Sequence, residues 1–337
     1  MERVVDIQSI VDSVQVPLLL KDTKVKQMSF VRDSLGNPLR WPGGYAVVFH
    51  LTSPSGQWAF RCLHTPLSNI SHRLNAISNY FKSVNLPYFC DFDYNECGLI
   101  ADGERIPTST MRWVDGEKLS DFIFAHSDKP TILATLARNF LAMCKAMSQN
   151  KIAHGDLQHE NILVGRDSSL YLIDYDSVYV PSLKGYSDII AGKLNYQHPK
   201  RESNSYASEK LDYFSELVIY LSLLAFSKRP SLIREFDIIK KEQLLFCKED
   251  YCSVSAFRNS KGYRQAIALG GECSKLAAIL ERYLKYNSID ELKPFWTYEV
   301  PNAKIVFTSS DVCGKCGRSY YAKDDLYCIY CGTKRTR

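Results

Sequence analysis

The segment between residues 154 and 177 constrains this chain more than any other part of the sequence. Asp156 opens a polar loop, Asn161 stands five residues later at its far end, and Asp174 follows the next apolar run. Strand-forming residues flank all three, so the pattern predicts a short strand–loop–strand unit that fixes the direction of these side chains. Isolated Asp residues in loops usually form turns, and that is the alternative for Asp156 and Asp174.

The three side chains suit the chemistry of phosphoryl transfer. Such a transfer needs a carboxylate that orients the acceptor hydroxyl and accepts its proton, and Asp156 on a loop can do this. It also needs oxygen ligands that hold magnesium against nucleotide phosphates, and Asn161 and Asp174 can converge on one ion. The spacing therefore predicts Asp156 as a base and the other two residues as magnesium ligands.

Along the chain, strand patterns come first and helical patterns second. Two apolar runs around a Thr-Ser-Pro-Ser-Gly turn predict an antiparallel hairpin over residues 45–49 and 58–63. Helical spacing is found over residues 70–84, 119–126, 131–149 and 211–226, and further short strands are expected over 88–92, 98–101 and 110–114. This order predicts an α+β architecture with a cleft between two lobes. Residues 1–25 favour neither a helix nor a strand.

Composition describes a soluble globular protein, with 45% apolar and 23% charged residues. The net charge of +5 is too small to imply nucleic-acid binding by itself. The apolar runs are too short to span a bilayer, and the N-terminus lacks the basic start of a secretory signal. Seven of the eleven cysteines are scattered singly. An odd total favours reduced thiols, so a cytoplasmic protein is expected.

The segment HGDLQHENILV, followed by IDYD, resembles the catalytic loop and metal-binding strand of the protein-kinase superfamily, especially of bacterial kinase-like proteins with these forms. Two later stretches fit the same order, Tyr196 to Pro199 as the end of an activation segment and Asp212 to Ser215 as the start of the buried helix behind the catalytic loop. The resemblance implies that His154 packs under the loop and that Asp212 binds its backbone amides. Asp176 stands where many kinases have glycine, and either metal assistance or a turn role is open.

Weaker motifs in the first third of the chain extend the resemblance to a nucleotide site. Gly43 to Val47 resembles a shortened nucleotide-covering loop, and Met111 to Gly116 resembles the hinge that holds adenine. The ATP-binding residues implied in this way are Gly43, Gly44, Val47, Ala59, Arg61, Met111 and Trp113. The implied divisions are a lead-in over residues 1–25, an N-lobe over 26–114 and a C-lobe over 115–300.

Four departures from the kinase pattern bear on activity. Arg61 occupies the lysine position, and an arginine is not equivalent to a lysine at a phosphate; a surface arginine on an edge strand is the alternative. Residues 62–90 contain no Asp or Glu that could pair with it. The covering loop has only two adjacent glycines, which a plain turn would also explain. Gly155 replaces the arginine found before the base in many regulated kinases, and Gln158 replaces a lysine.

The C-terminus carries a separate metal pattern over residues 311–334. Cys313 and Cys316 form one pair and Cys328 and Cys331 a second, each with a trailing glycine. Such pairs can place four thiolates around one zinc ion, so a structural zinc ribbon is predicted. A pair of redox dithiols is the alternative. The ribbon is basic, which leaves nucleic-acid contact possible, although a solvated face is favoured.

These observations together predict an ATP- and magnesium-dependent phosphotransferase with a structural zinc ion, most simply a kinase acting on Ser/Thr hydroxyls of a protein substrate. A pseudokinase that binds nucleotide or a protein partner is the first alternative, favoured by Arg61 and the missing glutamate. A small-molecule phosphotransferase of the aminoglycoside-kinase type, which also carries His-Gly-Asp, is the second.

Overall fold

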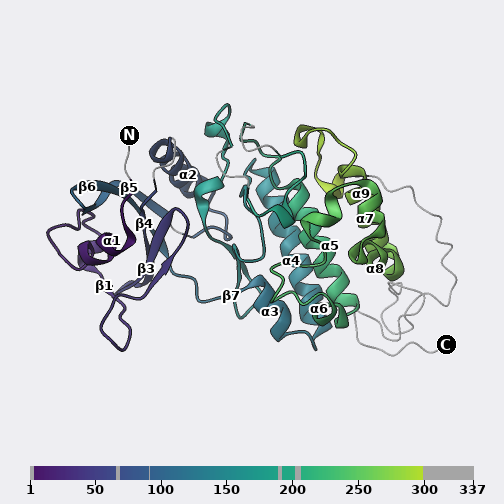
Figure 1. The fold of residues 1–337 in the computed structure, drawn as a ribbon, viewed down its shortest axis with the longest axis horizontal. Coiled ribbons are helices and arrows are strands. Elements are labelled where there is room, and N and C mark those ends of the chain that lie inside the picture. The colour runs from purple at the N-terminus through teal and green to yellow at the C-terminus, as the bar shows by residue number, and fades with distance from the viewer. Residues whose placement is uncertain (1–3, 66–68, 91, 189–191, 202–205, 299–337) are drawn as a thin grey trace.

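The computed structural model describes residues 4–65, 69–90, 92–188, 192–201 and 206–298. Strands gather in the first third of the chain and helices in the rest, and the two parts lie side by side along the long axis of the molecule (Figure 1). The predicted α+β arrangement is therefore confirmed. The predicted zinc ribbon over residues 311–334 lies outside the described residues.

The N-terminal part is built on a six-stranded antiparallel sheet. Its strands run in the order β1-β3-β4-β6-β5, and β2 also pairs with β3. Their bounds are β1 Ser29–Phe30, β2 Arg40–Pro42, β3 Ala46–Ser53, β4 Gly56–Leu63, β5 Phe92–Ala101 and β6 Glu104–Arg112. The predicted hairpin is β3–β4, which closes at the pair Ser53 and Gly56.

The predicted strand over residues 98–101 is the end of a longer strand, β5, which runs from Phe92 to Ala101. Of the predicted strand over residues 88–92 only Phe92 belongs to β5, and Phe89 forms an isolated bridge with Leu172 instead. The pairing of β5 with β6 shifts register between Asn95 and Leu99, which marks a bulge inside the strand. Gly98 allows it, since a Cβ at this position would lie 1.8 Å from the Thr108 hydroxyl oxygen.

The sheet separates two apolar clusters because side chains alternate along β3. Val47, Phe49 and Leu51 point to one face, where they pack with α1 (Ile7–Ser13). Residues 4–25, unassigned by the sequence, thus cover the back of the sheet, and the Leu19 carbonyl accepts a hydrogen bond from the Ile100 amide at 2.9 Å. The opposite face packs on α2 (Ile70–Val84), whose bounds are those predicted. Leu74, Ile77 and Phe81 form its buried side.

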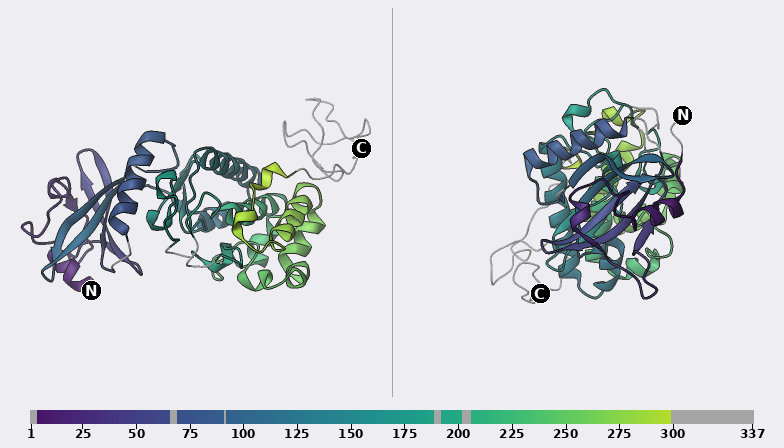
Figure 2. Two further views of the ribbon diagram at one scale, coloured as in Figure 1. Left: turned by 90° about the horizontal axis from the view of Figure 1, so that it is seen from above. Right: turned by 90° about the vertical axis from the view of Figure 1, so that its left-hand side faces the viewer.

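The C-terminal part is helical around a central buried helix, α5 (Tyr213–Lys228). It packs against α4 (Pro130–Gln149), α8 (Lys261–Leu269) and α9 (Gly271–Tyr283), which explains why it is apolar on every side. The other helices are α3 (Leu119–Ala125), α6 (Ser231–Glu235) and α7 (Val254–Asn259). Figure 2 shows these helices gathered at the end of the molecule away from the large sheet. In the part of the chain that the structure describes, no helix combines the length and apolar character needed to cross a bilayer.

A small sheet at the junction of the two parts positions the candidate site. It pairs β7 (Glu117–Lys118), β8 (Ile162–Val164) and β9 (Leu170–Leu172) in that order. The polar loop that carries Asp156 enters β8, and the turn that carries Asp174 leaves β9. The loop and the turn therefore both lie at this junction.

Candidate active site

The loop before β8 is held from below by a buried carboxylate. Asp212 accepts hydrogen bonds from the backbone amides of His154 and Gly155, the latter at 2.9 Å, as the resemblance implies. His154 is fully buried, and its Nε2 donates to the Ile173 carbonyl at 2.8 Å. These contacts tie the Asp156 loop to the strand that leads into Asp174.

The backbone at Gly155 leaves no room for a side chain. Its φ angle is +80°, a conformation that favours glycine. A Cβ at this position would also lie 2.2 Å from the Ser177 carbonyl oxygen. Glycine at this position thus lets the Asp156 loop and the segment after β9 approach each other closely.

Asp156 is oriented by two donors. The Asn161 Nδ2 donates to the Asp156 carbonyl at 2.8 Å and to its Oδ2 at 3.1 Å. The Lys193 backbone amide donates to the other carboxylate oxygen at 2.8 Å. Gly192, with φ of +74°, lies so close that a Cβ there would be 2.8 Å from Asp156 Oδ1. Residues 192 and 193 therefore cap the carboxylate that the sequence predicts as a base.

Arg61 is held by Asp176, a partner that the sequence did not identify. Its guanidinium forms a two-pronged ion pair with this carboxylate, with one of the two hydrogen bonds at 2.5 Å, and lies 3.4 Å from Asp174. The Arg61 side chain is 19% exposed and that of Asp176 only 4%, so neither is a surface group. The carboxylate missing from residues 62–90 is thus supplied by the turn after β9.

The electrostatics of this cluster follow from burial and proximity. Burial opposes the charged form of Arg61, but Asp176 and Asp174 outweigh it, so the pKa of the guanidinium is raised. Burial raises the pKa of Asp174; the Asp176 charge acts in the same direction, and Arg61 opposes both. A further cation at Asp174 would therefore favour its ionised form.

A cavity of about 590 Å³ opens between the large sheet and the β8–β9 sheet. The predicted residues Ala59, Arg61, Met111, Trp113, Asn161 and Asp174, and both glycines of the covering loop, line it. Asp156 lies next to this wall, joined to it by Asn161. Val47 is fully buried on the other face of β3, and its neighbour Val48 lines the cavity in its place.

Sequence reasoning missed several residues that line the cavity. Leu163 and Ile173 form the floor from β8 and the segment after β9, and Tyr45 adds to the covering loop. The period-2 pattern of β3 could have identified Val48, because Ala46 and Val48 share a face. No comparable pattern pointed to Asp176 as the partner of Arg61.

Aromatic rings close the outer end of the cavity. The Trp113 ring stacks on His50 at 4.0 Å between ring centroids, and Trp41 of β2 lies 5.3 Å from it. Trp41 is 48% exposed, while it lines the same cavity as Trp113. These contacts fasten the linker after β6 to β2 and β3.

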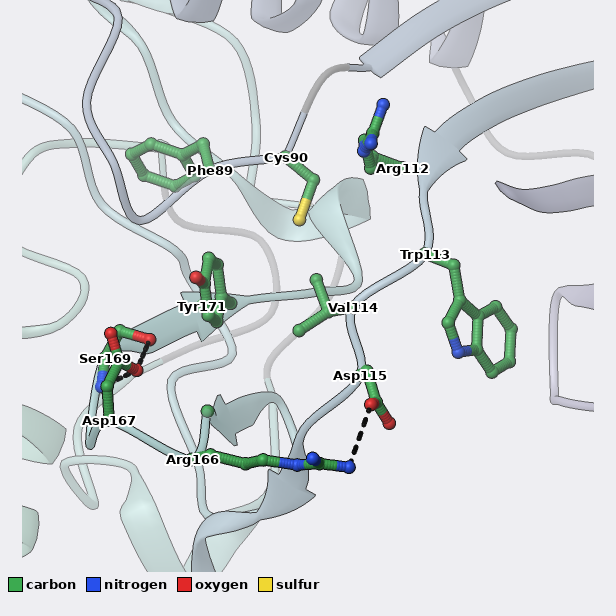
Figure 3. Close-up of a pocket in the computed structure, with 11 residues that line it drawn as sticks. Phe89, Cys90, Arg112, Trp113, Val114, Asp115, Arg166, Asp167, Ser169 and Tyr171 are labelled. Carbon is green, nitrogen blue, oxygen red and sulfur yellow. Dashed lines mark hydrogen bonds and ion pairs between the residues drawn. The ribbon is translucent and has the colours of Figure 1, made fainter. Parts of the chain in front are cut away.

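A second hollow of about 590 Å³ lies on the other side of that linker. Figure 3 shows the thiol of Cys90 and the side chain of Val114 pointing into it, with the exposed ion pair of Asp115 and Arg166 at its rim. The Trp113 side chain points away from this hollow (Figure 3). Trp113 is among the residues that line both cavities. The linker is thus bordered by open space on both sides.

Among the described residues, no group of three or more His, Cys, Asp or Glu side chains is arranged to hold a metal ion. Magnesium, however, usually takes one or two carboxylates together with water and phosphate oxygens. Asn161 uses its amide nitrogen on Asp156, which leaves an amide oxygen on the cavity wall, and the half-exposed Asp174 carboxylate lies on the same wall. This pair of oxygen donors fits magnesium bound to a nucleotide.

Comparison with known proteins adds no family to this geometry. No protein-family model matches the chain, and no curated protein is similar enough to it to be matched.

Proposed function

We propose that the chain binds ATP with magnesium in the cavity between its two parts and transfers the terminal phosphoryl group to a hydroxyl. The observation that carries the proposal is the Asp156 carboxylate, oriented by Asn161 and Lys193 beside a wall that also presents Asp174. The cavity volume of about 590 Å³ lies within the range of small-molecule sites. Its apolar walls and floor suit a base, and its polar end at Arg61, Asn161 and Asp174 suits a triphosphate.

Asn161 and Asp174 would hold the magnesium ion, which when bound supplies positive charge to the phosphates. Asp156 lies next to them and accepts the proton of the acceptor hydroxyl as the new phosphorus–oxygen bond forms. The two hydrogen bonds from Asn161 and Lys193 fix the direction of its carboxylate. That orientation is the contribution that the folded chain makes before any substrate arrives.

Arg61 takes the place of a phosphate-binding lysine at the inner end of the cavity. Its fork is held by Asp176, so its position is fixed by the turn after β9. Arginine donates in a planar fork and can contact phosphate oxygens with the nitrogen edges that Asp176 does not use. We assign it to binding and orienting the nucleotide phosphates.

A protein hydroxyl, of serine or threonine, is the acceptor that we favour. The stretch from Asp174 to Pro199 resembles an activation segment, and the Lys193 amide within it donates to Asp156. A segment in that place borders the acceptor side of the site, and a peptide chain could lie along it.

A nucleotide-binding scaffold without transfer is the second candidate. The observation that favours it is the engagement of Arg61 with two carboxylates at once, Asp176 and Asp174. In that arrangement one guanidinium neutralises part of the charge that would attract the metal. Transfer then requires Arg61 to share Asp174 with magnesium.

The test uses the full chain with labelled ATP and magnesium, with and without generic protein substrates. Asp156→Ala is expected to lower transfer by about 10²-fold or more, the contribution of a positioned base, while ATP affinity stays near that of the wild type. Asp128→Ala is the matched control, because Asp128 is an exposed aspartate in the turn between α3 and α4. Nucleotide binding without any transfer or ATP turnover by the wild type would favour the scaffold.

A further inference from the structure

The helix α2 carries a fully buried arginine at its contact with the C-terminal part. Arg73 is 0% exposed, and its Nη1 donates to the Ser187 carbonyl at 3.2 Å. Its Nε and Nη2 find no hydrogen-bond acceptor among the described residues. Burial lowers the pKa of the Arg73 guanidinium, and the nearby charges of Asp188 and Asp176 oppose this effect, so they offset part of the cost of burying it.

The neighbour of Ser187 continues this contact. Asp188 forms a buried ion pair with Arg201, with two contacts of 2.8 Å to the same carboxylate oxygen. The Arg201 Nη1 also donates to the Gly155 carbonyl and to Gln197. A continuous set of polar contacts therefore runs from α2, through Ser187 and Asp188, to the residue that precedes Asp156.

The residues between these contacts include the cap on Asp156. We call Ser187–Asp188 together with residues 192–201 the capping segment. Its start is bound by Arg73 from α2, its end is bound to Gly155 through Arg201, and its Lys193 amide donates to the Asp156 carboxylate. A ring contact adds to the first of these, since His72 of α2 stacks on Tyr186 at 4.9 Å between centroids.

We propose that Arg73 is a positioning residue that sets the capping segment over Asp156, so that this contact of α2 controls transfer and leaves nucleotide binding largely unaffected. The control of transfer rests on the function proposed above. In this chain Arg61, the proposed phosphate-binding cation, is oriented by Asp176 and not by a carboxylate on α2. The helix α2 contacts the turn of Asp176 through Phe81, whose ring lies 5.1 Å from that of Tyr175 between centroids, and it contacts the capping segment through Arg73.

The test compares Arg73→Met with Lys82→Met, a matched control on the same helix, where the lysine is 59% exposed. Backbone amide exchange is followed by mass spectrometry in a peptide that contains Lys193 and begins at least two residues before it. Arg73→Met is expected to speed this exchange by at least about tenfold and to lower kcat by a similar factor, with the KM for ATP within twofold of wild type. Lys82→Met should change none of the three.

Several outcomes separate the possible failures. Unchanged exchange at Lys193 in Arg73→Met would overturn the inference, as would a rise in the KM for ATP with an unchanged kcat. If Arg73→Met does not fold, Arg73→Gln replaces it, because glutamine is neutral and too short to reach Ser187; the same increase in exchange is expected. If the wild type transfers no phosphate, the proposed function fails, and the exchange result still decides whether Arg73 sets the cap.

Discussion

Replacing Asp176 with asparagine tests whether the turn after β9 anchors Arg61. The substitution keeps the size of the side chain and removes its charge, which leaves the guanidinium paired only with Asp174 at 3.4 Å. Two opposite charges about 4 Å apart attract by roughly 4 kcal/mol at the dielectric typical of such sites. Breaking a buried pair usually costs about 3–5 kcal/mol. Because Asp174 retains part of the attraction, we expect a loss of about 2–3 kcal/mol.

The assay is urea unfolding followed by tryptophan fluorescence, since Trp41, Trp58 and Trp113 all lie in or next to the large sheet. ATP affinity is measured on the same samples and should fall, because Arg61 loses one of the two groups that orient it. Asp115→Asn is the matched control for stability: Asp115 also pairs with an arginine, at 3.7 Å, but is 91% exposed. Exposed pairs contribute little, so no measurable change is expected. Equal urea midpoints for Asp176→Asn and the wild type would refute this account of Arg61.

Three further predictions address the loop, its pH dependence and the C-terminus. Gly155→Ala should destabilise the fold by more than about 1 kcal/mol and abolish transfer, because a Cβ would lie 2.2 Å from the Ser177 carbonyl oxygen. Denaturant titrations of Gly185→Ala are the control, because that glycine also has a positive φ but its Cβ would meet nothing within 4 Å. The comparison separates backbone strain from steric clash. Burial lowers the pKa of His159 to about 4, with Lys193 acting in the same direction, so the unfolded chain takes up its proton first as pH falls. Stability should therefore drop between about pH 6.5 and pH 4, by up to about 3 kcal/mol, and unfolding of His159→Gln measured across that range should lack this part of the slope. Elemental analysis should find one zinc per chain and none after Cys313→Ser; a metal-free wild type would exclude the ribbon.

Local patterns predicted most of the elements that frame the cleft. The helix α2 was placed correctly because its apolar residues recur at helical spacing on one side, and the β3–β4 hairpin because its turn chemistry is strong. The loop from Asp156 to Asn161 was interpretable for a related reason: its polar residues stand between short apolar strands that leave few directions for the side chains. In each case the information lies within about twenty residues of sequence.

The features that the sequence did not reveal depend on contacts between distant segments. Arg61 and Asp176 are separated by 115 positions, and a search of residues 62–90 for the missing acid could not find a partner on the other side of the cleft. The burial of Arg73 likewise follows from the packing of α2 against Ser187, whereas arginine is by type among the residues most often exposed. Register explains the placement of Val47, since one step along a strand reverses the face.

The position of Asp176 has a consequence for how such a site could be controlled. A carboxylate on a mobile helix can orient the phosphate-binding cation only while the helix is in place, so nucleotide binding and helix position are linked. Here the carboxylate is Asp176, which stands two residues after Asp174 and is 4% exposed. One turn therefore fixes the positions of Asp174 and of the partner of Arg61. Removing the Arg73 side chain would then leave the pair of Arg61 and Asp176 in place and act on Ser187. Titration of ATP against Arg73→Met and Asp176→Asn should accordingly give opposite patterns, with affinity retained in the first variant and reduced in the second. Equal ATP affinities of the two variants would show that Arg73 and the pair of Arg61 and Asp176 do not act on separate parts of the site.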